Sequence, residues 1–345
     1  MDLSIALLLG QDGVTNGAIY ALLALALVMV FAVTRVIFIP QGQFVAYGAL
    51  TLAAMQSGKY PGTVWLLIAL GVLAVLMDAW IAFRDRQTRK LVRSLGYNLA
   101  VPLVIAGIMA ALNPAELPLA VQIGLTLLLV VPLGPILYRV AYEPLSEATV
   151  LTLLIVSVAV DFAMLGLGLL FFGPEAFRTP AFSEGSLTIG ELTVNAQTLW
   201  VIGCSAVLIV VLFLFFERTI YGKALRATAI NRVGARLMGI PTTLAGRLTF
   251  FVAALIGTFS GVLFAPITPI SYDTGFLIGL KGFVAAILGG LGSYPLAAVG
   301  AIFVGLLESF SSFWASEYKE VIVFTIIIPV LLWRSLFTHH VEEEE

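Results

Sequence analysis

Residues 217–247, ERTIYGKALRATAINRVGARLMGIPTTLAGR, form a basic segment between two apolar runs, 199–216 and 248–267. Each run is long enough to cross a hydrocarbon core about 30 Å thick. Good helix formers at 222–239 predict one amphipathic helix, which ends where Gly239 is followed by Pro241. Its two faces consist of the apolar Leu225, Ile230, Val233 and Leu237 and the basic Lys223, Arg226, Arg232 and Arg236. We therefore expect a helix between two spans that either lies on anionic headgroups or docks a soluble partner.

The composition indicates a polytopic membrane protein. Of 345 residues, 60% are hydrophobic and only 11% are charged, which is too few charges to cover a soluble globule of this size. The basic residues lie in a few loops, so nothing suggests binding to nucleic acid. A single cysteine, Cys204, excludes an internal disulfide and a thiolate metal cluster, and no metal site is expected. The first residues, MDLSIALLLG, lack the positive charge of a signal peptide and are interpreted as mature protein.

The apolar runs predict an all-α transmembrane helix bundle of ten to eleven spans, some short or broken, in a single domain over 1–345. With the N-terminus outside, 14 of the 18 Lys and Arg residues fall in inside loops, as the positive-inside rule requires. The C-terminus is then inside. The candidate spans are 17–34, 42–57, 62–83, 96–112, 118–138, 149–172, 197–216, 248–268, 276–291, 295–314 and 321–333.

The largest outside segment is 173–195. Within it, SLTIG and ELTVN alternate polar and apolar residues around Gly190. This pattern predicts a small β-hairpin, with a plain connector as the alternative.

Polar side chains are few within the spans, and two places stand out. Asp161 lies in the middle of its span and either lines a solute path or makes a hydrogen bond to a neighbouring helix. In FIPQGQFVAYG, Pro40 and Gly42 interrupt the helix, and the candidate path residues there are Gln41, Gln43 and Tyr47. Broken helices present polar contacts within the bilayer, although this stretch can also be a loop that merely begins the second span.

Lys281 and Glu308 are charges of opposite sign in consecutive spans. If these spans form an antiparallel hairpin that turns near Ser293 and Pro295, the two residues lie equally deep, about 8 Å from the outer end. We expect either an ion pair, which a charge exchange between the two residues restores, or a Lys281 that reaches the interface alone. The glycines of GGLGS, 289–293, are expected to serve close helix packing, since no strand precedes them as in a phosphate-binding loop.

Several stretches together resemble bacterial ABC-importer permeases of the branched-chain amino-acid type. The resemblance follows the order of that family over most of the chain, so it is more specific than any single motif. The stretches are GAIYALLALALVMVFAVTRVIFIPQGQFVAYGAL, YRVAYEPLSEATVLTLLIVSVAV, GKALRATAINRVGARLMGIP, FVAALIGTFSGVL and VAAILGGLGSYPLAAVGAIFVGLLE.

The resemblance implies a role for each side of the membrane. Residues 217–247 become a cytoplasmic coupling loop whose helix lies across the spans and engages an ATP-binding subunit, with Arg226 and Arg232 on its exposed surface. The outside face, including 173–195, meets a periplasmic substrate-binding protein. The expected coupling residues are Gly222, Lys223, Ala224, Arg226, Ala227, Asn231, Ala235 and Gly239.

The resemblance also implies partners and a location. A second permease subunit, homologous or an identical copy, completes the pathway in the lipid of a bacterial inner membrane, with the N-terminus periplasmic and the C-terminus cytoplasmic. The chain has no G-x-x-x-x-G-K-[ST] motif, so no cofactor is expected on it, and ATP and Mg²⁺ belong to the partner.

The chain departs from the family pattern in two places. Residues 78–117 look like an insertion. In FIPQGQFVAYG, the family usually has an Asn at Phe38 and an acid at Gln43, so recognition that used this acid is in doubt. The substrate stays open among branched-chain amino acids, urea or related amides, and small organic acids.

Two other functional classes remain as alternatives. A secondary transporter or channel would work without an ATPase, but it needs ionisable coupling residues, and the spans offer only Asp161, Lys281 and Glu308. An intramembrane enzyme would need catalytic groups, and the spans have no histidine and no paired carboxylates.

Overall fold

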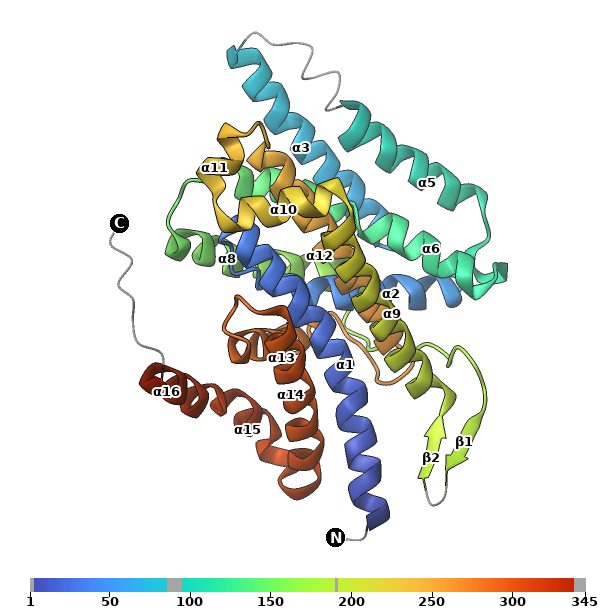
Figure 1. Ribbon diagram of the computed structural model, residues 1–345. Coiled ribbons are helices and arrows are strands. Elements are labelled where there is room, and N and C mark those ends of the chain that lie inside the picture. The colour runs from blue at the N-terminus through green and yellow to red at the C-terminus, as the bar shows by residue number, and fades with distance from the viewer. Residues whose placement is uncertain (1–2, 86–94, 190–191, 338–345) are drawn as a thin grey trace.

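The structure is a computed structural model that describes residues 3–85, 95–189 and 192–337 (Figure 1). Apart from one two-stranded sheet, its regular elements are helices, so the predicted all-α helix bundle is confirmed. The first half contains α1 Leu3–Thr34, α2 Gln41–Gln56, α3 Thr63–Asp85, η1 Gly96–Ala100, α5 Val101–Ala111, η2 Pro114–Glu116, α6 Leu119–Val130, α7 Leu133–Leu137, η3 Tyr138–Tyr142, η4 Glu143–Leu145 and α8 Val150–Phe172. The second half contains β1 Ser186–Ile189, β2 Leu192–Asn195, α9 Ala196–Arg218, α10 Ile220–Ile230, α11 Arg232–Leu237, α12 Thr242–Phe264, α13 Thr274–Leu288, α14 Tyr294–Trp314, η5 Ser316–Tyr318, α15 Lys319–Thr325 and α16 Ile327–Phe337.

Within the described residues, seven helices are long and apolar enough to cross a membrane. They correspond to seven of the eleven expected spans. The other four runs form helices that are short or broken, namely α2, η1 with α5, α13, and α15 with α16. The first span is longer than predicted, because α1 begins at Leu3 and its first half packs through Gly13 and Gly17 against Gly305 of α14.

The core of the bundle is formed by α1 and α12, with α2, α13 and α14 packed around them. In the most apolar stretch of α1, 83% of the residues are buried, against 11% in α9. The long helices α3, α8 and α9 are therefore peripheral and turn most of their apolar surface outward. A transmembrane helix with such a surface faces lipid or another subunit.

Small residues let the inner helices approach closely. Gly42, at the start of α2, lies against Gly275 and Gly279 of α13, and a Cβ at Gly42 would overlap the Gly275 carbonyl oxygen. In the expected packing segment, a Cβ at Gly289 would overlap the backbone of Ala297 in α14. Gly289 thus serves helix packing, as the sequence predicted, whereas Gly290, with φ +74°, lies in the turn.

The two ends of the molecule differ (Figure 1). One end carries α10, α11 and the C-terminal end of α3, and the opposite end carries the start of α1 and the two strands. The predicted hairpin is present, since β1 and β2 pair antiparallel with Ser186 opposite Asn195 and Ile189 opposite Leu192. Ahead of it, Phe177 and Ile270 exchange backbone hydrogen bonds of 2.9 and 2.8 Å, which tie this segment to the loop after α12.

Candidate functional site

The segment between α9 and α12 contains two helices, so the prediction of one continuous helix over 222–239 is wrong. The chain is extended at Asn231, with φ −146° and ψ 101°, which separates α10 from α11. Asn231 Oδ1 accepts a hydrogen bond of 2.7 Å from the Gly234 N–H. A cap of this kind favours the start of a new helix at Arg232 over continuation of α10. Gly239, with φ +84°, ends the segment as expected.

The break also divides the predicted apolar stripe. Leu225 is buried, whereas the apolar side chains at and after the break are exposed. We call this group the apolar docking patch: Ile230 (80% exposed), Val233 (70%), Leu237 (82%) and Met238 (83%). Exposed apolar side chains so close together mark a surface that contacts another molecule.

The expected coupling residues fall into two sets. Lys223, Arg226 and Asn231 are exposed, and Arg226 donates a hydrogen bond of 3.0 Å to Glu217 Oε1. Ala224 and Ala227 are half-buried, and Gly222 and Ala235 are buried, with Gly222 against Phe215 and Phe216 of α9. Arg226 is thus exposed as predicted, but Arg232 is half-buried and donates to the Ser146 carbonyl.

Beneath α10 lies a cavity of about 980 Å³ between α1, α9 and the turn after α13. Its lining is mainly apolar, with Arg35, Glu217 and Arg226 among the charged residues. One side of α10 therefore borders this cavity.

The candidate path residues lie in α2 and α8, and all four are buried. Gln43 Nε2 donates a hydrogen bond of 3.0 Å to Asp161 Oδ1, which joins α2 to α8. Tyr47 Oη donates to the Met164 carbonyl at 2.5 Å, and Gln41 Nε2 donates to the Ala253 carbonyl at 2.9 Å. Asp161 thus makes the interhelical hydrogen bond that was one of its two predicted roles, and a role in a solute path stays a prediction.

Lys281 and Glu308 come together as the sequence predicted, with 2.6 Å between Lys281 Nζ and Glu308 Oε1. The structure adds two partners that the sequence pattern did not indicate. Glu320 Oε1 of α15 lies 3.1 Å from Lys281 Nζ, and Tyr20 Oη of α1 donates to Glu308 Oε2 at 2.5 Å. We call these four residues the outer network.

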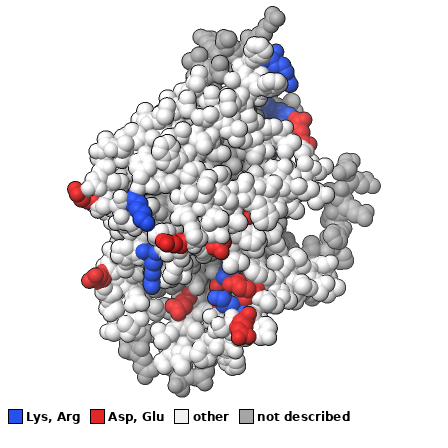
Figure 2. Space-filling model, turned by 180° about the vertical axis from the view of Figure 1, so that it is seen from behind, with Lys and Arg blue, Asp and Glu red and all other residues white. Residues whose placement is uncertain are grey.

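Two polar cavities flank α1 at this end of the molecule. One, of about 570 Å³, is lined by the outer network and by Asp12 and Asn16. The other, of about 660 Å³, shares Asp12 and Asn16 and extends to Arg178 and Glu184. Seen from behind, acidic and basic side chains gather in the lower half, below a wide uncharged area (Figure 2).

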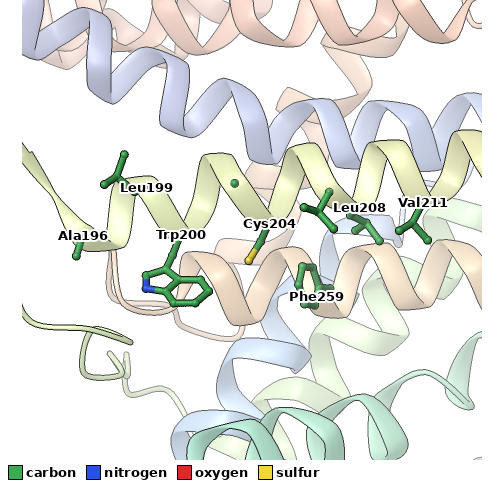
Figure 3. Close-up of a pocket in the computed structure, with 9 residues that line it drawn as sticks. Ala196, Leu199, Trp200, Cys204, Leu208, Val211 and Phe259 are labelled. Atoms are coloured by element: carbon green, nitrogen blue, oxygen red, sulfur yellow. The ribbon is translucent and has the colours of Figure 1, made fainter.

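A groove along α9 has a different character (Figure 3). Trp200 and Cys204 project from α9 toward α12, which carries Phe259, and the groove of about 520 Å³ is lined by apolar groups. The lining has no charged side chain, so the groove suits an acyl chain or an apolar helix and not a polar solute.

Comparison with known proteins decides the family. A family model described as "Branched-chain amino acid transport system / permease component" matches residues 92–331, which is 240 of the 345 residues. The chain belongs to this permease family. The match begins inside 78–117, so the interpretation of that segment as an insertion stays a prediction.

Curated relatives of this permease extend over nearly its whole length. LivH of Escherichia coli K12, a high-affinity branched-chain amino acid transport system permease protein, is 27% identical over 335 residues, covering 93% of this chain and 91% of LivH. BraD of Pseudomonas aeruginosa, named for the same system, is 29% identical and covers 82% of this chain and 94% of BraD. The solved structure of PsaBC from Streptococcus pneumoniae in complex with Fab aligns with 94% of this chain and 89% of its own at 11% identity, but its TM-score of 0.36 supports no comparison.

Membership in this family sets the class of function. The chain is a transport subunit of an ATP-driven importer and not an enzyme, and ATP hydrolysis takes place on separate subunits. The alternative of a transporter or channel without an ATPase is therefore not supported. The family also implies ATP-binding subunits and a substrate-binding protein as partners.

Proposed function

We propose that this permease moves branched-chain amino acids into the bacterial cytoplasm and that its apolar docking patch contacts an ATP-binding subunit. The observation that carries the proposal is the patch itself, four exposed apolar side chains next to basic residues at one end of a transport subunit. The substrate is inferred from the names of LivH and BraD. ATP and Mg²⁺ are proposed to bind the partner.

The docking patch has the physical properties of an interface centre. Val233 and Leu237 are four residues apart on α11 and so lie on one face of that helix. Removing such apolar area from water favours association, at roughly 25 cal/mol per Å² before the costs of binding are subtracted. Lys223, Arg226 and Arg236 are exposed basic residues on the same two helices, which suits an acidic surface on the partner.

The same proposal assigns the two ends of the molecule. The end with α10 and α11 is cytoplasmic, because basic residues such as Arg139, Arg232 and Arg247 lie there, as the positive-inside rule requires. The N-terminus and the β-hairpin are then periplasmic, where the hairpin offers a contact for the substrate-binding protein, and the C-terminus is cytoplasmic. A second permease subunit, homologous or identical, packs against one of the lipid-exposed spans.

Transport then follows from two states of the complex. Closure of the ATP-binding subunits moves α10 and α11 relative to the spans, and the permease exchanges an outward-open for an inward-open arrangement. ATP can shift this equilibrium only to the extent that the docked partner binds one arrangement better than the other.

Acidic substitutions in the docking patch test the proposal. In the complex reconstituted in nanodiscs, Val233→Asp or Leu237→Asp is expected to abolish copurification of the ATP-binding subunits and leucine-stimulated ATP hydrolysis, because a charge is placed in an apolar contact. Leu187→Asp is the matched control for copurification alone, since the hairpin is proposed to contact the substrate-binding protein. Leu187 is also an exposed apolar residue, 57% exposed, but it lies in the hairpin at the opposite end.

The outcomes separate the parts of the proposal. Normal ATP-driven uptake into proteoliposomes by Val233→Asp and Leu237→Asp would exclude the patch as the docking surface. If the wild-type complex took up urea or a carboxylic acid but no leucine, isoleucine or valine, only the proposed substrate would be contradicted. Side chains such as Ala235 are less suitable for this test, because Ala235 is buried and an acid there would disturb the segment itself.

A further inference from the structure

The short segment Glu143–Glu147 lies between two spans at the docking end. It follows the π-helix η3, passes through the 3₁₀-helix η4 and leads into α8, which Thr149 caps by accepting a hydrogen bond from the Thr152 N–H. Single π-helical turns are rare overall, and those that occur often lie at functional sites. The sequence YEPLSE belongs to one of the stretches that resemble the family, and it lies outside both the coupling residues and the path residues.

Glu143 joins two basic residues from different elements. Arg247, near the start of α12, donates to Glu143 Oε2 from Nε at 3.0 Å and from Nη2 at 2.9 Å. Arg139 of η3 donates from Nη1 to Glu143 Oε1 at 2.5 Å. Arg139 also pairs with Asp78 of α3, with 3.0 Å between its Nε and Asp78 Oδ1. We call Asp78, Arg139, Glu143 and Arg247 the inner network.

The same segment is attached to the helix that carries the docking patch. Arg232, the first residue of α11, donates from Nη1 to the Ser146 carbonyl oxygen at 3.2 Å. Arg236, one turn later, lies 3.6 Å from Glu147 Oε1. The second contact is weak, because both of its side chains are more than half exposed.

We propose that Glu143 is a positioning residue that transmits movement of the docked α11 to α3, α8 and α12. This inference rests on the proposed function of α10 and α11. The segment contacts α11 through Ser146, α12 through Arg247 and α3 through Arg139, and it leads directly into α8. In α8, Asp161 accepts the hydrogen bond from Gln43 of α2.

The position of Glu143 explains why one carboxylate can hold these elements together. Its side chain is only 11% exposed, so its attraction to the two arginines is screened less than at an open surface. Arg139 donates to Oε1, and Arg247 donates to both oxygens, with its Nη2 3.2 Å from Oε1, so the carboxylate is shared between the two arginines. Loss of the charge leaves neither arginine stranded, because Arg139 keeps Asp78 and Arg247 is 44% exposed to water.

The test uses Glu143→Gln in the assembled complex in nanodiscs, with the substrate-binding protein present. The ratio of leucine-stimulated to unstimulated ATP hydrolysis is expected to fall about twofold to thirtyfold, the range seen when residues of a coupling network are replaced. The amount of assembled complex stays at the wild-type level. Arg247→Gln reports the same link from the other side, and the double variant is expected to be no worse than the more affected single variant.

Glu147→Gln is the matched control, since it makes the same change in the same segment at a side chain that is 82% exposed, and it is expected to leave the ratio unchanged. An unchanged ratio in both Glu143→Gln and Arg247→Gln overturns the positioning role. A parallel loss of assembly and of both hydrolysis rates also overturns it, because that result indicates a purely structural pair. Failure of the proposed function is distinguished by the wild type, which would then show no stimulation by leucine at all.

Discussion

The outer and inner networks are built from the same kinds of charges but hold the molecule in different ways. The outer network joins α1, α13, α14 and α15 through an ion pair whose side chains are 7% and 11% exposed. The inner network joins α3, η3 and α12, and its outermost member, Arg247, is 44% exposed. Buried pairs hold helices in place, whereas a partly hydrated pair can break and re-form at low cost. The comparison assigns packing of the spans to the outer network and transmission of movement to the inner one.

The largest effect is expected from Lys281→Met. This change leaves Glu308 and Glu320 near each other without their shared counter-charge, and removal of one partner from a buried pair costs roughly 3–5 kcal/mol. The melting temperature of the detergent-solubilised protein should therefore fall clearly. Lys319→Met, the same substitution at a half-buried neighbouring lysine outside the ion pairs of this network, should lower it much less. Equal melting temperatures for the two variants would show that the outer network does not hold the spans.

A charge exchange sharpens this prediction. With only Lys281 and Glu308, the exchange Lys281→Glu with Glu308→Lys should restore stability, as the sequence alone predicts. The structure changes that expectation, because the carboxylate introduced at position 281 would face Glu320 and the ammonium introduced at position 308 would face the Tyr20 hydroxyl. The double variant should therefore remain less stable than the wild type. Full recovery would remove Glu320 from the network.

An intermediate effect is expected from Asp161→Leu. It leaves the Gln43 amide buried without its acceptor, at a cost of about 1–3 kcal/mol. Asp161→Asn keeps an acceptor oxygen and should be close to wild type in thermal stability. Normal stability combined with lost leucine uptake in Asp161→Asn would place this carboxylate in the solute path in addition to the helix contact.

These contacts show what a sequence can predict. Lys281 and Glu308 were predictable, because two consecutive antiparallel helices place residues equally far from their turn at equal depth. Glu320 and Tyr20 were not, since their positions depend on how α15 and α1 pack against that hairpin. The apolar runs likewise predicted the spans, but not that α1 begins fourteen residues before its predicted start, which requires the glycine contacts with α14.

The coupling segment shows the limit from the other side. Its alanines favour one continuous helix, but in the structure the Asn231 side chain caps α11 and outweighs that propensity. Because of that break, Leu225 faces inward and Val233 faces outward, so the docking patch could not be read from a single helical period. The inner network was missed because its members come from three separate segments.

The smallest effect on stability is expected from Arg247→Met. The arginine is 44% exposed, and pairs of this kind contribute about 0–1 kcal/mol. Its melting temperature should lie near that of the wild type, while the leucine stimulation of ATP hydrolysis falls. A large loss of stability would make the inner network resemble the outer one and would remove the distinction between them.

The docking patch is tested most directly by crosslinking within the purified, transport-competent complex. Cys204 is the single cysteine, so a Cys204→Ala background allows one new thiol at a time. We expect Leu237→Cys, after labelling with a short thiol-reactive photocrosslinker, to capture the ATP-binding subunit, identified by mass spectrometry. Leu187→Cys should not capture it. Capture of the ATP-binding subunit from Leu187, and none from Leu237 in a complex that still transports leucine, would contradict the assignment of the two ends of the molecule.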